Sequence, residues 1–273
     1  MLLRIFDVAH GFCALVIADT GNIMLIDCGD NDETGFYPAD YLIKSGFRGI
    51  ERFFVLNFDE DHLSGLPRLR QMRDRVPVRI LHKNFSITDG QLRDLKEQSG
   101  GLGPGMRALL AMSGNYNQTV TSPPDFGLLS YEVFYNNYPT FEDTNNLSLV
   151  LFLDYPGLSI VFPGDLEVAG WEALLENISF RQRLSRVNVF VASHHGRENG
   201  YSDAVFDYCA PEIVVISDEE IRFDTQEAVD YAVHAKGINW TTGGVRRVLT
   251  TRLDGMIWFE ADALGMTWVK VSK

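Results

Sequence analysis

Short apolar runs that end in turn residues recur along the chain, a pattern typical of buried β-strands. Residues 14–30 contain two apolar strands separated by a turn at 19–21, and the second strand leads into Gly-Asp. Residues 149–165 repeat this arrangement, with a turn at 154–157 and again a final Gly-Asp. Turn residues between two short apolar runs predict a β-hairpin in each half of the chain.

The segments that follow the two hairpins also correspond. Each hairpin precedes a helical pattern, then a buried strand, then a polar loop. In the first half these segments are residues 38–45, 53–56 and 57–62, and in the second half they are 168–177, 187–192 and 193–196. The same order of elements therefore occurs twice, in halves of about 1–115 and 116–273.

Two such halves predict an α/β (α+β) fold, an αββα sandwich in which two mixed β-sheets pack face to face with helices outside. No shift of composition separates the halves, so we expect a single domain over residues 1–273. The polar loops would meet along one edge of the sandwich. The Gly-rich segment 100–105 is expected to be a flexible loop between the halves.

The C-terminal pattern predicts a helix at 225–236, followed by three strands at 246–250, 256–260 and 266–271. An Asp254-Gly255 turn would join the first two of these strands. We expect this part to add to an edge of the second sheet.

Composition narrows the class of protein. The chain has 273 residues, of which 45% are hydrophobic and 22% charged, enough for a sizeable core. Its net charge of −13 argues against a broad nucleic-acid-binding face but leaves a small local basic site open. No run of about 18 apolar residues exists, so no membrane span is expected.

The N-terminal and cysteine patterns bear on the cellular location. Charged or polar residues at 4, 7 and 10 interrupt the N-terminal apolar run, so no signal peptide is expected. The three cysteines are far apart and form no CxxC pair, which indicates neither a disulfide framework nor a cysteine zinc site. A reducing, cytoplasmic location is the simplest expectation.

The polar loops carry candidate metal ligands. Carboxylates and neutral imidazoles from different strand ends are the ligands that divalent metals take in proteins. The candidates are Asp59, Asp61 and His62 in the first loop, Asp165 after the second hairpin, and His194 or His195 in the last loop.

Each candidate also has an ordinary structural interpretation. Asp61-His62 alone fits a helix start, Asp165 alone fits a turn or cap, and either histidine alone fits a satisfied core imidazole. Their shared place at strand ends favours the metal interpretation. His10 lies in a turn after the first strand, from which it can face the site, whereas His82 and His234 are expected to be structural or surface residues.

Together these segments resemble the metallo-β-lactamase-fold hydrolases, whose signature is H-x-H-x-D-H. The subgroup that they resemble is the cytoplasmic hydrolase domain of the bacterial competence DNA-uptake channel and its stand-alone relatives. The resemblance spans nearly the whole chain and is carried by the segments at 6–11, 25–29, 57–65, 145–150, 162–167 and 193–196.

The resemblance implies a ligand set for one metal. Asp61, His62, Asp165 and a histidine of the His-His-Gly segment would hold it, with His194 preferred over His195 because relatives place the ligand two residues before the glycine. Asp165 would bridge two metals. Asp61 would also orient or deprotonate water, so Asp61 and Asp165 are the expected catalytic residues.

The chain departs from the family signature at its first two histidines. Asn57 and Asp59 stand there, and the histidine often found ahead of the bridging Asp is replaced by the region of Asn145-Asn146. Asp59 would still offer a hard oxygen ligand. Three consequences are open. The change would shift the metal preference from zinc toward manganese, magnesium or iron, or leave a single metal, or abolish metal binding at the first site. We therefore expect one or two divalent ions (zinc, manganese or iron) per chain.

Two functions follow from this resemblance. The first is a metal-dependent hydrolase of a phosphodiester or related ester, with Asn57, His195 and Arg197 as substrate-binding residues and Arg246 or Arg247 as further candidate anion contacts. For each arginine the ordinary interpretation is a surface residue. Its substrate would be a phosphorylated small molecule, or a nucleic acid that a protein partner brings to it. The second is a non-catalytic binding or scaffold protein with a degenerate metal site. Asp224 is expected near the edge where relatives place another polar residue.

Overall fold

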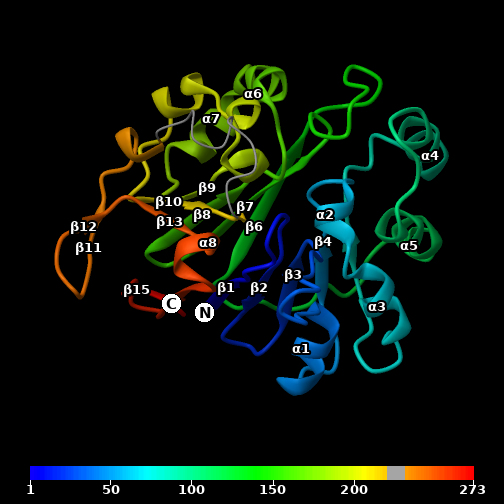
Figure 1. Cartoon of the computed structure of the whole chain (residues 1–273), viewed down its shortest axis with the longest axis horizontal. Helices are drawn as coiled ribbons and strands as arrows, with labels where there is room; N and C mark the ends of the chain where they lie inside the picture. Colours follow the sequence, from blue (N-terminus) through cyan, green and yellow to red (C-terminus); the bar gives the residue numbers. More distant parts are fainter. Residues whose placement is uncertain (220–230) are drawn as a thin grey trace.

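The computed structural model describes residues 1–219 and 231–273. Two mixed β-sheets lie against each other, and helices cover their outer faces (Figure 1). The first sheet has seven strands in the order β15-β14-β1-β2-β3-β4-β5. Its strands are β1 (Leu2–Ile5), β2 (Ala14–Ile17), β3 (Ile23–Ile26), β4 (Arg52–Phe54), β5 (Leu81–His82), β14 (Ile257–Ala261) and β15 (Thr267–Val271).

The second sheet has six strands in the order β13-β10-β9-β8-β7-β6. They are β6 (Ser130–Tyr135), β7 (Leu149–Tyr155), β8 (Leu158–Phe162), β9 (Val189–Val191), β10 (Ile213–Ile216) and β13 (Val248–Thr250). A separate small ribbon pairs β11 (Ile238–Asn239) with β12 (Val245–Arg246).

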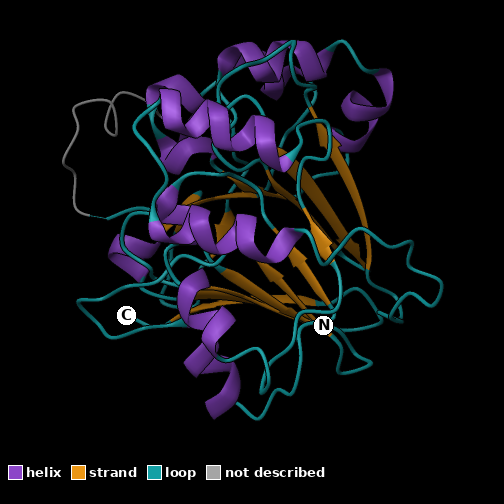
Figure 2. Ribbon diagram, turned by 90° about the vertical axis from the view of Figure 1, so that its right-hand side faces the viewer, coloured by secondary structure: helices purple, strands orange, loops and turns teal. Residues whose placement is uncertain are grey.

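The α-helices lie on the outside of the strands (Figure 2). They are α1 (Pro38–Lys44), α2 (Glu60–Leu63), α3 (Leu66–Gln71), α4 (Asp89–Gln98), α5 (Pro104–Ser113), α6 (Val168–Leu175), α7 (Ile178–Leu184) and α8 (Thr251–Asp254). Short 3-10 turns occupy Ser193–Gly196, Glu198–Gly200, Asp203–Asp207 and Tyr231–Val233. No helix in the described part of the chain has both the length and the apolar character that a membrane span requires.

Three apolar layers hold the elements together. The central layer lies between the sheets and joins residues such as Phe54 of the first sheet to Leu151 of the second. A second layer joins the outer face of the first sheet to α1, α3 and α5. A third joins the outer face of the second sheet to α6 and α7, around the buried Trp171. The predicted αββα sandwich is therefore confirmed by the packing of the chain itself.

The repeat predicted from the sequence is visible in the strand pairing. β2 and β3 form an antiparallel hairpin, and β3 then pairs with β4 in parallel across α1. β7 and β8 form the second hairpin, and β8 pairs with β9 in parallel after α6 and α7. Because parallel neighbours point the same way, the carboxyl ends of β3 and β4 share one edge, and those of β8 and β9 share another.

The expected place of the C-terminal strands is wrong for two of the three. β13 does extend the second sheet, but β14 and β15 join the first sheet, where β14 pairs with β1. Ile257 and Phe259 of β14 are opposite Ile5 and Leu3 and complete the layer between the sheets. The helix α8, rather than a plain turn, carries the chain from one sheet to the other. Local sequence predicts a strand but not the sheet edge that accepts it.

Two further expectations change in the described part of the chain. The Gly-rich segment is not wholly a loop, since Pro104 begins α5. Most of the predicted late helix, residues 225–230, lies outside the described residues, and Tyr231–Val233 forms a short 3-10 turn.

His82 and His234 have structural surroundings, as expected. The ring of His82 stacks on Phe54 with centroids 4.6 Å apart, and its Nε2 lies 2.6 Å from a guanidinium nitrogen of Arg52. Burial and the neighbouring Arg52 lower the pKa of His82 to about 4. His234 stacks on Phe206 with centroids 4.0 Å apart.

The lowered pKa of His82 predicts a pH-dependent stability. Between about pH 6.5 and 4 the unfolded chain takes up a proton at this residue that the folded chain does not, so the free energy of unfolding falls as the pH falls through this window. His82→Gln keeps an acceptor for Arg52 but does not titrate. Urea unfolding at several pH values should give a shallower decline for His82→Gln than for the wild type, and parallel curves would contradict this account.

Candidate metal centre

The candidate site lies where strand-end loops of the two sheets meet. The loop after β4 leads into α2, whose first turn carries Asp61 and His62. Asp165 follows β8, and the 3-10 turn with His194 and His195 follows β9. The predicted convergence of these loops is therefore seen in the described structure.

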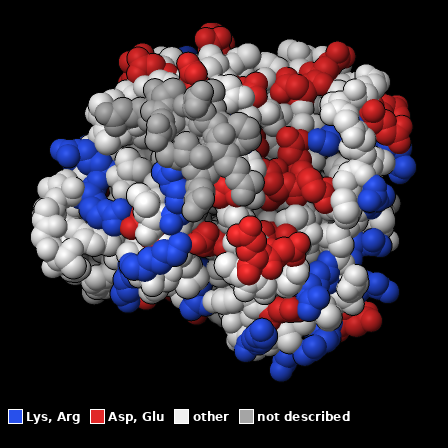
Figure 3. Space-filling model, in the orientation of Figure 1, with Lys and Arg blue, Asp and Glu red and all other residues white. Residues whose placement is uncertain are grey.

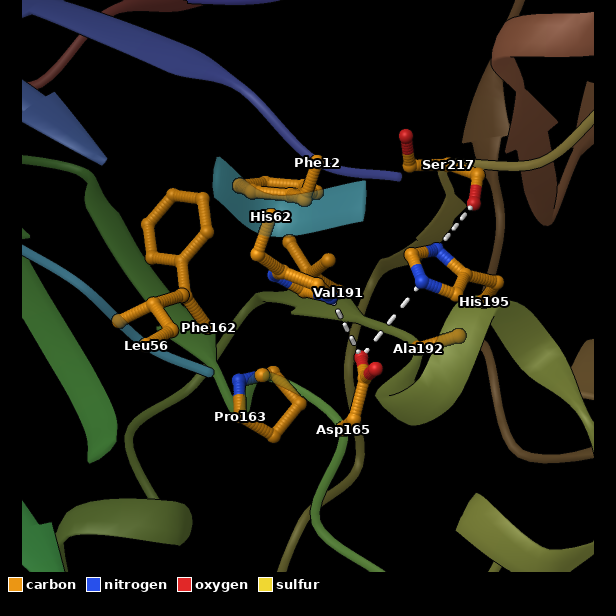
Figure 4. Close-up of a pocket in the computed structure, with 11 residues that line it drawn as sticks. Phe12, Leu56, His62, Phe162, Pro163, Asp165, Val191, Ala192, His195 and Ser217 are labelled. Atoms are coloured by element: carbon orange, nitrogen blue, oxygen red, sulfur yellow. Dashed lines mark hydrogen bonds and ion pairs between the residues drawn. The ribbon is translucent and has the colours of Figure 1, made fainter. Parts of the chain in front are cut away.

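Four side chains converge at this edge: Asp61, His62, Asp165 and His195, named here the ligand cluster. One ligand atom from each lies within 4.8 Å of the other three. His62 Nε2 is 2.9 Å from Asp165 Oδ1, and His195 Nε2 is 3.6 Å from the same oxygen (Figure 4). His195 Nε2 is also 3.2 Å from Asp61 Oδ2. Two imidazoles and two carboxylates thus face a single point.

Both imidazoles are held by hydrogen bonds at Nδ1, the ring nitrogen that faces away from the cluster. His62 Nδ1 lies 2.6 Å from Asp27 Oδ2, and His195 Nδ1 lies 3.0 Å from the carbonyl oxygen of Ser217. These acceptors favour a proton on Nδ1, so in the neutral form of each ring the lone pair of Nε2 faces the cluster. Hydrogen-bonded backing of this kind is characteristic of histidines that bind metals.

The cluster contains buried polar atoms whose close contacts are ion pairs with one another and which make no hydrogen bond. They are His62 Nε2, His195 Nε2 and Asp165 Oδ1, the same atoms that face one another. Buried polar atoms usually make hydrogen bonds, so a set of them that converges on one place fits a site for an ion or water. Two nitrogens and two carboxylates in this arrangement fit a divalent cation.

The electrostatics of the cluster lead to the same conclusion. Burial alone would lower the pKa of His62, but the carboxylates of Asp165 and Asp27 raise it well above the ordinary value. Burial would raise the pKa values of Asp61 and Asp165, yet the neighbouring imidazoles lower both, that of Asp165 to about 2. The carboxylates therefore require a positive charge beside them, which a proton on His62 or a metal ion can supply.

A small cavity of about 10 Å³ adjoins the cluster. His62, Asp165 and His195 form its polar wall, while Phe12, Leu56, Phe162 and Val191 form an apolar one (Figure 4). This volume is close to that of a single water-sized species. The apolar wall keeps the ligand atoms away from bulk solvent and strengthens their interaction with a charge.

Backbone strain is concentrated around the cluster. In the described residues, the non-glycine positions with positive φ are Ala9, Asp27, His194 and His195, with φ of 58°, 52°, 49° and 56°. This conformation is costly for residues with a Cβ and persists at functional sites where the surroundings enforce it. Here it turns Asp27 toward His62 and separates the side chains of the two adjacent histidines.

Two glycines allow close packing against the backbone of the loop that carries Asp61. A Cβ at Gly11 or Gly29 would collide with the carbonyl oxygen of Asp61. Gly11 also has a φ of +133°, which only glycine adopts readily. The loop after β1 and the loop after β3 therefore both press directly on the residue that carries a ligand.

Asp27 is a site residue that the sequence analysis missed as such. Its Oδ1 accepts a 2.6 Å hydrogen bond from the backbone N–H of Leu56, and its Oδ2 holds His62. The signals in the sequence were its place at the end of an apolar strand, which an ordinary turn residue shares, and its place in the segment 25–29 that carries the resemblance. Its contact with a histidine 35 positions away exists only in the folded chain.

The two adjacent histidines take different places. His195 joins the cluster, whereas His194 Nδ1 lies 3.6 Å from Glu167 Oε1 and its Nε2 lies 3.5 Å from Arg197 Nη1. The geometry therefore favours His195 for the place that the resemblance gave to His194. Consecutive residues in left-handed conformations point apart, which spacing to the following glycine does not reveal.

Asp59 and Asn57 lie outside the cluster. Asp59 Oδ1 binds Lys96 Nζ at 2.5 Å and Thr144 Oγ1 at 2.8 Å. Asn57 is fully buried, and its side chain bonds Asn145 and Ser148 rather than facing an open space. The structure thus separates Asp59 from the ligands with which it was grouped, and it buries Asn57, an expected substrate contact.

Arg197 and His10 lie beside the cluster. Arg197 Nη2 donates to His10 Nε2 at 3.1 Å, and the same His10 atom is 3.4 Å from Asp61 Oδ2. The rings of His10 and His195 have centroids 4.5 Å apart. His10 therefore faces the site from the loop after β1. Burial and the nearby His195 lower the pKa of His10 to about 4.

The other arginines proposed as anion contacts have structural partners. Arg246 forms a double hydrogen bond with Asp254, at 2.7 and 2.8 Å, and Arg247 donates to the carbonyl of Ala235. The expectation that they bind substrate is not supported by these contacts. Asp224 lies outside the described residues.

Comparison with known proteins gives structural similarity without sequence similarity. No family model and no curated protein matches the chain. It is similar to the metallo-beta-lactamase fold protein YhfI from Bacillus subtilis, with 9% identity, 98% of this chain and 99% of that chain covered, and a TM-score of 0.49. A diphosphatase of the PhnP family covers 100% of this chain and 99% of its own, with 10% identity and a TM-score of 0.46. The short form of human tRNase Z covers 79% of this chain and 91% of its own, with 14% identity and a TM-score of 0.39.

The TM-scores of these three structures are below 0.5, so the similarities do not describe the site of this chain. The fold class rests on the two sheets and three apolar layers of this chain. The competence-channel subgroup remains an expectation from the sequence.

Asp27→Asn tests the support of the cluster. An amide cannot accept hydrogen bonds from both Leu56 and His62 through two oxygens, so His62 loses its fixed orientation. We expect metal affinity, measured by competition with a chromogenic chelator, to fall by about 10–100-fold. The matched control is Asp30→Asn, whose carboxyl bonds Ser64 instead. An equal loss in both variants would contradict a specific role for Asp27.

Proposed function

We propose that this chain is a metal-dependent hydrolase whose ion is held by the ligand cluster. The observation that supports this proposal best is the set of orphaned ligand atoms on His62, His195 and Asp165, which lie opposite the carboxylate of Asp61. A purely structural polar cluster would satisfy these atoms internally. When bound, a divalent ion supplies Lewis acidity toward water and toward an oxygen of the substrate.

The residues of the chain have distinct tasks in this proposal. His62, Asp165 and His195 are almost fully buried and hold the ion. Asp61 has 23% of its side chain exposed, so it is the member that reaches the open side of the cluster. There its carboxylate accepts a hydrogen bond from water and can take up its proton. Asp61 and Asp165 are therefore the proposed catalytic residues.

The open side of the cluster favours an anionic substrate. Arg197 and His10 meet beside Asp61, and the guanidinium of Arg197 is the positive group there. Guanidinium groups bind phosphate oxygens well because their N–H donors form a planar fork. We therefore propose a phosphodiester or related ester as the substrate class.

The surface charge bears on the size of the substrate. The net charge is −13, and acidic side chains cluster near the middle of the face in Figure 3, while basic ones gather toward its edges. A local basic groove between α3 and α5 is lined by Arg70, Arg73 and Arg107. This distribution favours a phosphorylated small molecule, or a nucleic acid delivered by a protein partner. A cytoplasmic location with no membrane association is part of the same proposal.

A non-catalytic binding or scaffold protein is the second candidate function. The observation that favours it is the ion pair of Asp59 with Lys96, because the carboxylate at this position of the signature then binds an ammonium instead of a metal ion. A scaffold, however, gives no reason for orphaned buried ligand atoms. The two candidates differ in whether bound metal is needed for turnover.

The hydrolase proposal is tested with protein loaded separately with Mn²⁺, Zn²⁺ or Fe²⁺ and offered bis(4-nitrophenyl) phosphate, 4-nitrophenyl phosphate and a chromogenic cephalosporin. We expect the diester to be cleaved fastest, chelation to abolish the activity, and Asp165→Asn to lower kcat/KM by at least about 100-fold.

The control variant is Asp203→Asn, since the Asp203 side chain is 81% exposed. It should retain full activity. Metal-loaded wild-type protein that cleaves none of these substrates would favour the scaffold, and activity that survives both chelation and Asp165→Asn would place the chemistry elsewhere.

A further inference from the structure

We infer that the chain binds a single metal ion, at the ligand cluster, and that Lys96 supplies the positive charge that Asp59 would otherwise take from a second ion. This inference rests on the proposed function and makes it more specific. It follows from the contrast between two neighbouring groups of polar side chains, one with orphaned ligand atoms and one whose members already bind one another.

Asp59 already has a cation. Its Oδ1 lies 2.5 Å from the ammonium of Lys96, which is only 14% exposed, and 2.8 Å from the hydroxyl of Thr144. Lys96 lies in the last turn of α4, and the backbone N–H of Gly101 closes that turn on the Lys96 carbonyl. An ammonium in this position neutralises the carboxylate as a divalent ion would, without requiring further ligands.

The side chain of Asn57 already makes hydrogen bonds through both its oxygen and its nitrogen. Its side-chain oxygen accepts the backbone N–H of Asp59 at 2.8 Å, and its amide nitrogen donates to Asn145 Oδ1 at 3.1 Å and Ser148 Oγ at 3.3 Å. Ser148 Oγ in turn accepts the backbone N–H of Asp165. Turning Asn57 toward a metal would break these bonds at a fully buried residue, which is costly.

Asn145 and Asn199, the next polar residues, have a hydrogen-bond partner in Glu167. Asn145 Nδ2 and Asn199 Nδ2 both donate to Glu167 Oε1, at 3.0 and 2.7 Å. Among the residues that the structure describes, the ligand cluster is the one group in which three or more histidine, cysteine or carboxylate ligands come together. The hydrogen bonds around Asn57 and Asp59 therefore replace the coordination that a second ion would provide.

The first experiment counts ions. Full-length protein is saturated with Mn²⁺, desalted and analysed for metal content, and its electron paramagnetic resonance spectrum is recorded. We expect one Mn²⁺ per chain with the signal of an isolated ion. Asp59→Asn should keep one ion with a Kd within about threefold of the wild-type value, whereas His195→Ala should lose it.

The outcomes separate this inference from the proposed function. Two ions with an exchange-coupled spectrum, one of them lost in Asp59→Asn, would overturn the single-ion inference and leave the hydrolase proposal in place. No bound ion in the wild type would overturn the hydrolase proposal itself. One ion that Asp59→Asn removes would show that Asp59 is a ligand and would also overturn the inference.

The second experiment tests Lys96. Lys96→Met leaves the Asp59 carboxylate without its cation, so titration should reveal a second, weaker Mn²⁺ that the double variant Lys96→Met/Asp59→Asn lacks. Lys96→Arg, which keeps the charge, should bind one ion like the wild type. A single ion in Lys96→Met, with its fold retained by circular dichroism, would overturn the role given to Lys96.

Discussion

The imidazole of His62 lies between two buried carboxylates, Asp27 after β3 of one sheet and Asp165 after β8 of the other. This triad ties the two halves of the sandwich together at the edge where their loops meet. Asp27 also holds the N–H of Leu56, whose carbonyl accepts the N–H of Leu149 at the start of β7. The site therefore depends on the same bonds that set one sheet against the other.

Burial makes this arrangement chemically demanding. Two carboxylates (Asp27 and Asp165) and two imidazoles (His62 and His195) are withdrawn from water, Asp61 is partly so, and a positive charge is needed among them. The atoms of the cluster that lack hydrogen-bond partners mark where that charge belongs. The neighbouring group around Asn57 and Asp59 meets the same demand in another way, through Lys96 and a chain of amide hydrogen bonds. Buried carboxylates are thus neutralised in two neighbouring ways, by a proposed ion at the ligand cluster and by Lys96 at Asp59. The second way differs from the signature that the chain resembles.

Much of this arrangement could be predicted from the sequence, because hairpins, helices and strand-end loops are local features. The repeated hairpins and the helices at Pro38–Lys44 and Val168–Leu175 follow from apolar runs and their spacing. The strand-end loops offered Asp61, His62 and Asp165 among other candidates, and the family resemblance grouped these three. The sheet that accepts β14 could not be predicted, since Ile257 and Phe259 would fit either edge. The choice of His195 over His194 depends on two left-handed backbone conformations, and the role of Asp27 depends on a partner 35 positions away.

The central claim is that one ion lies among Asp61, His62, Asp165 and His195. Anomalous diffraction from crystals grown with Mn²⁺ or Zn²⁺, recorded on both sides of the absorption edge of the metal, tests this claim directly. The account predicts one strong peak within bonding distance of Nε2 of both histidines and of an oxygen of each aspartate. A peak beside His194 and Glu167, a second peak at Asp59, or no peak at the cluster would contradict it.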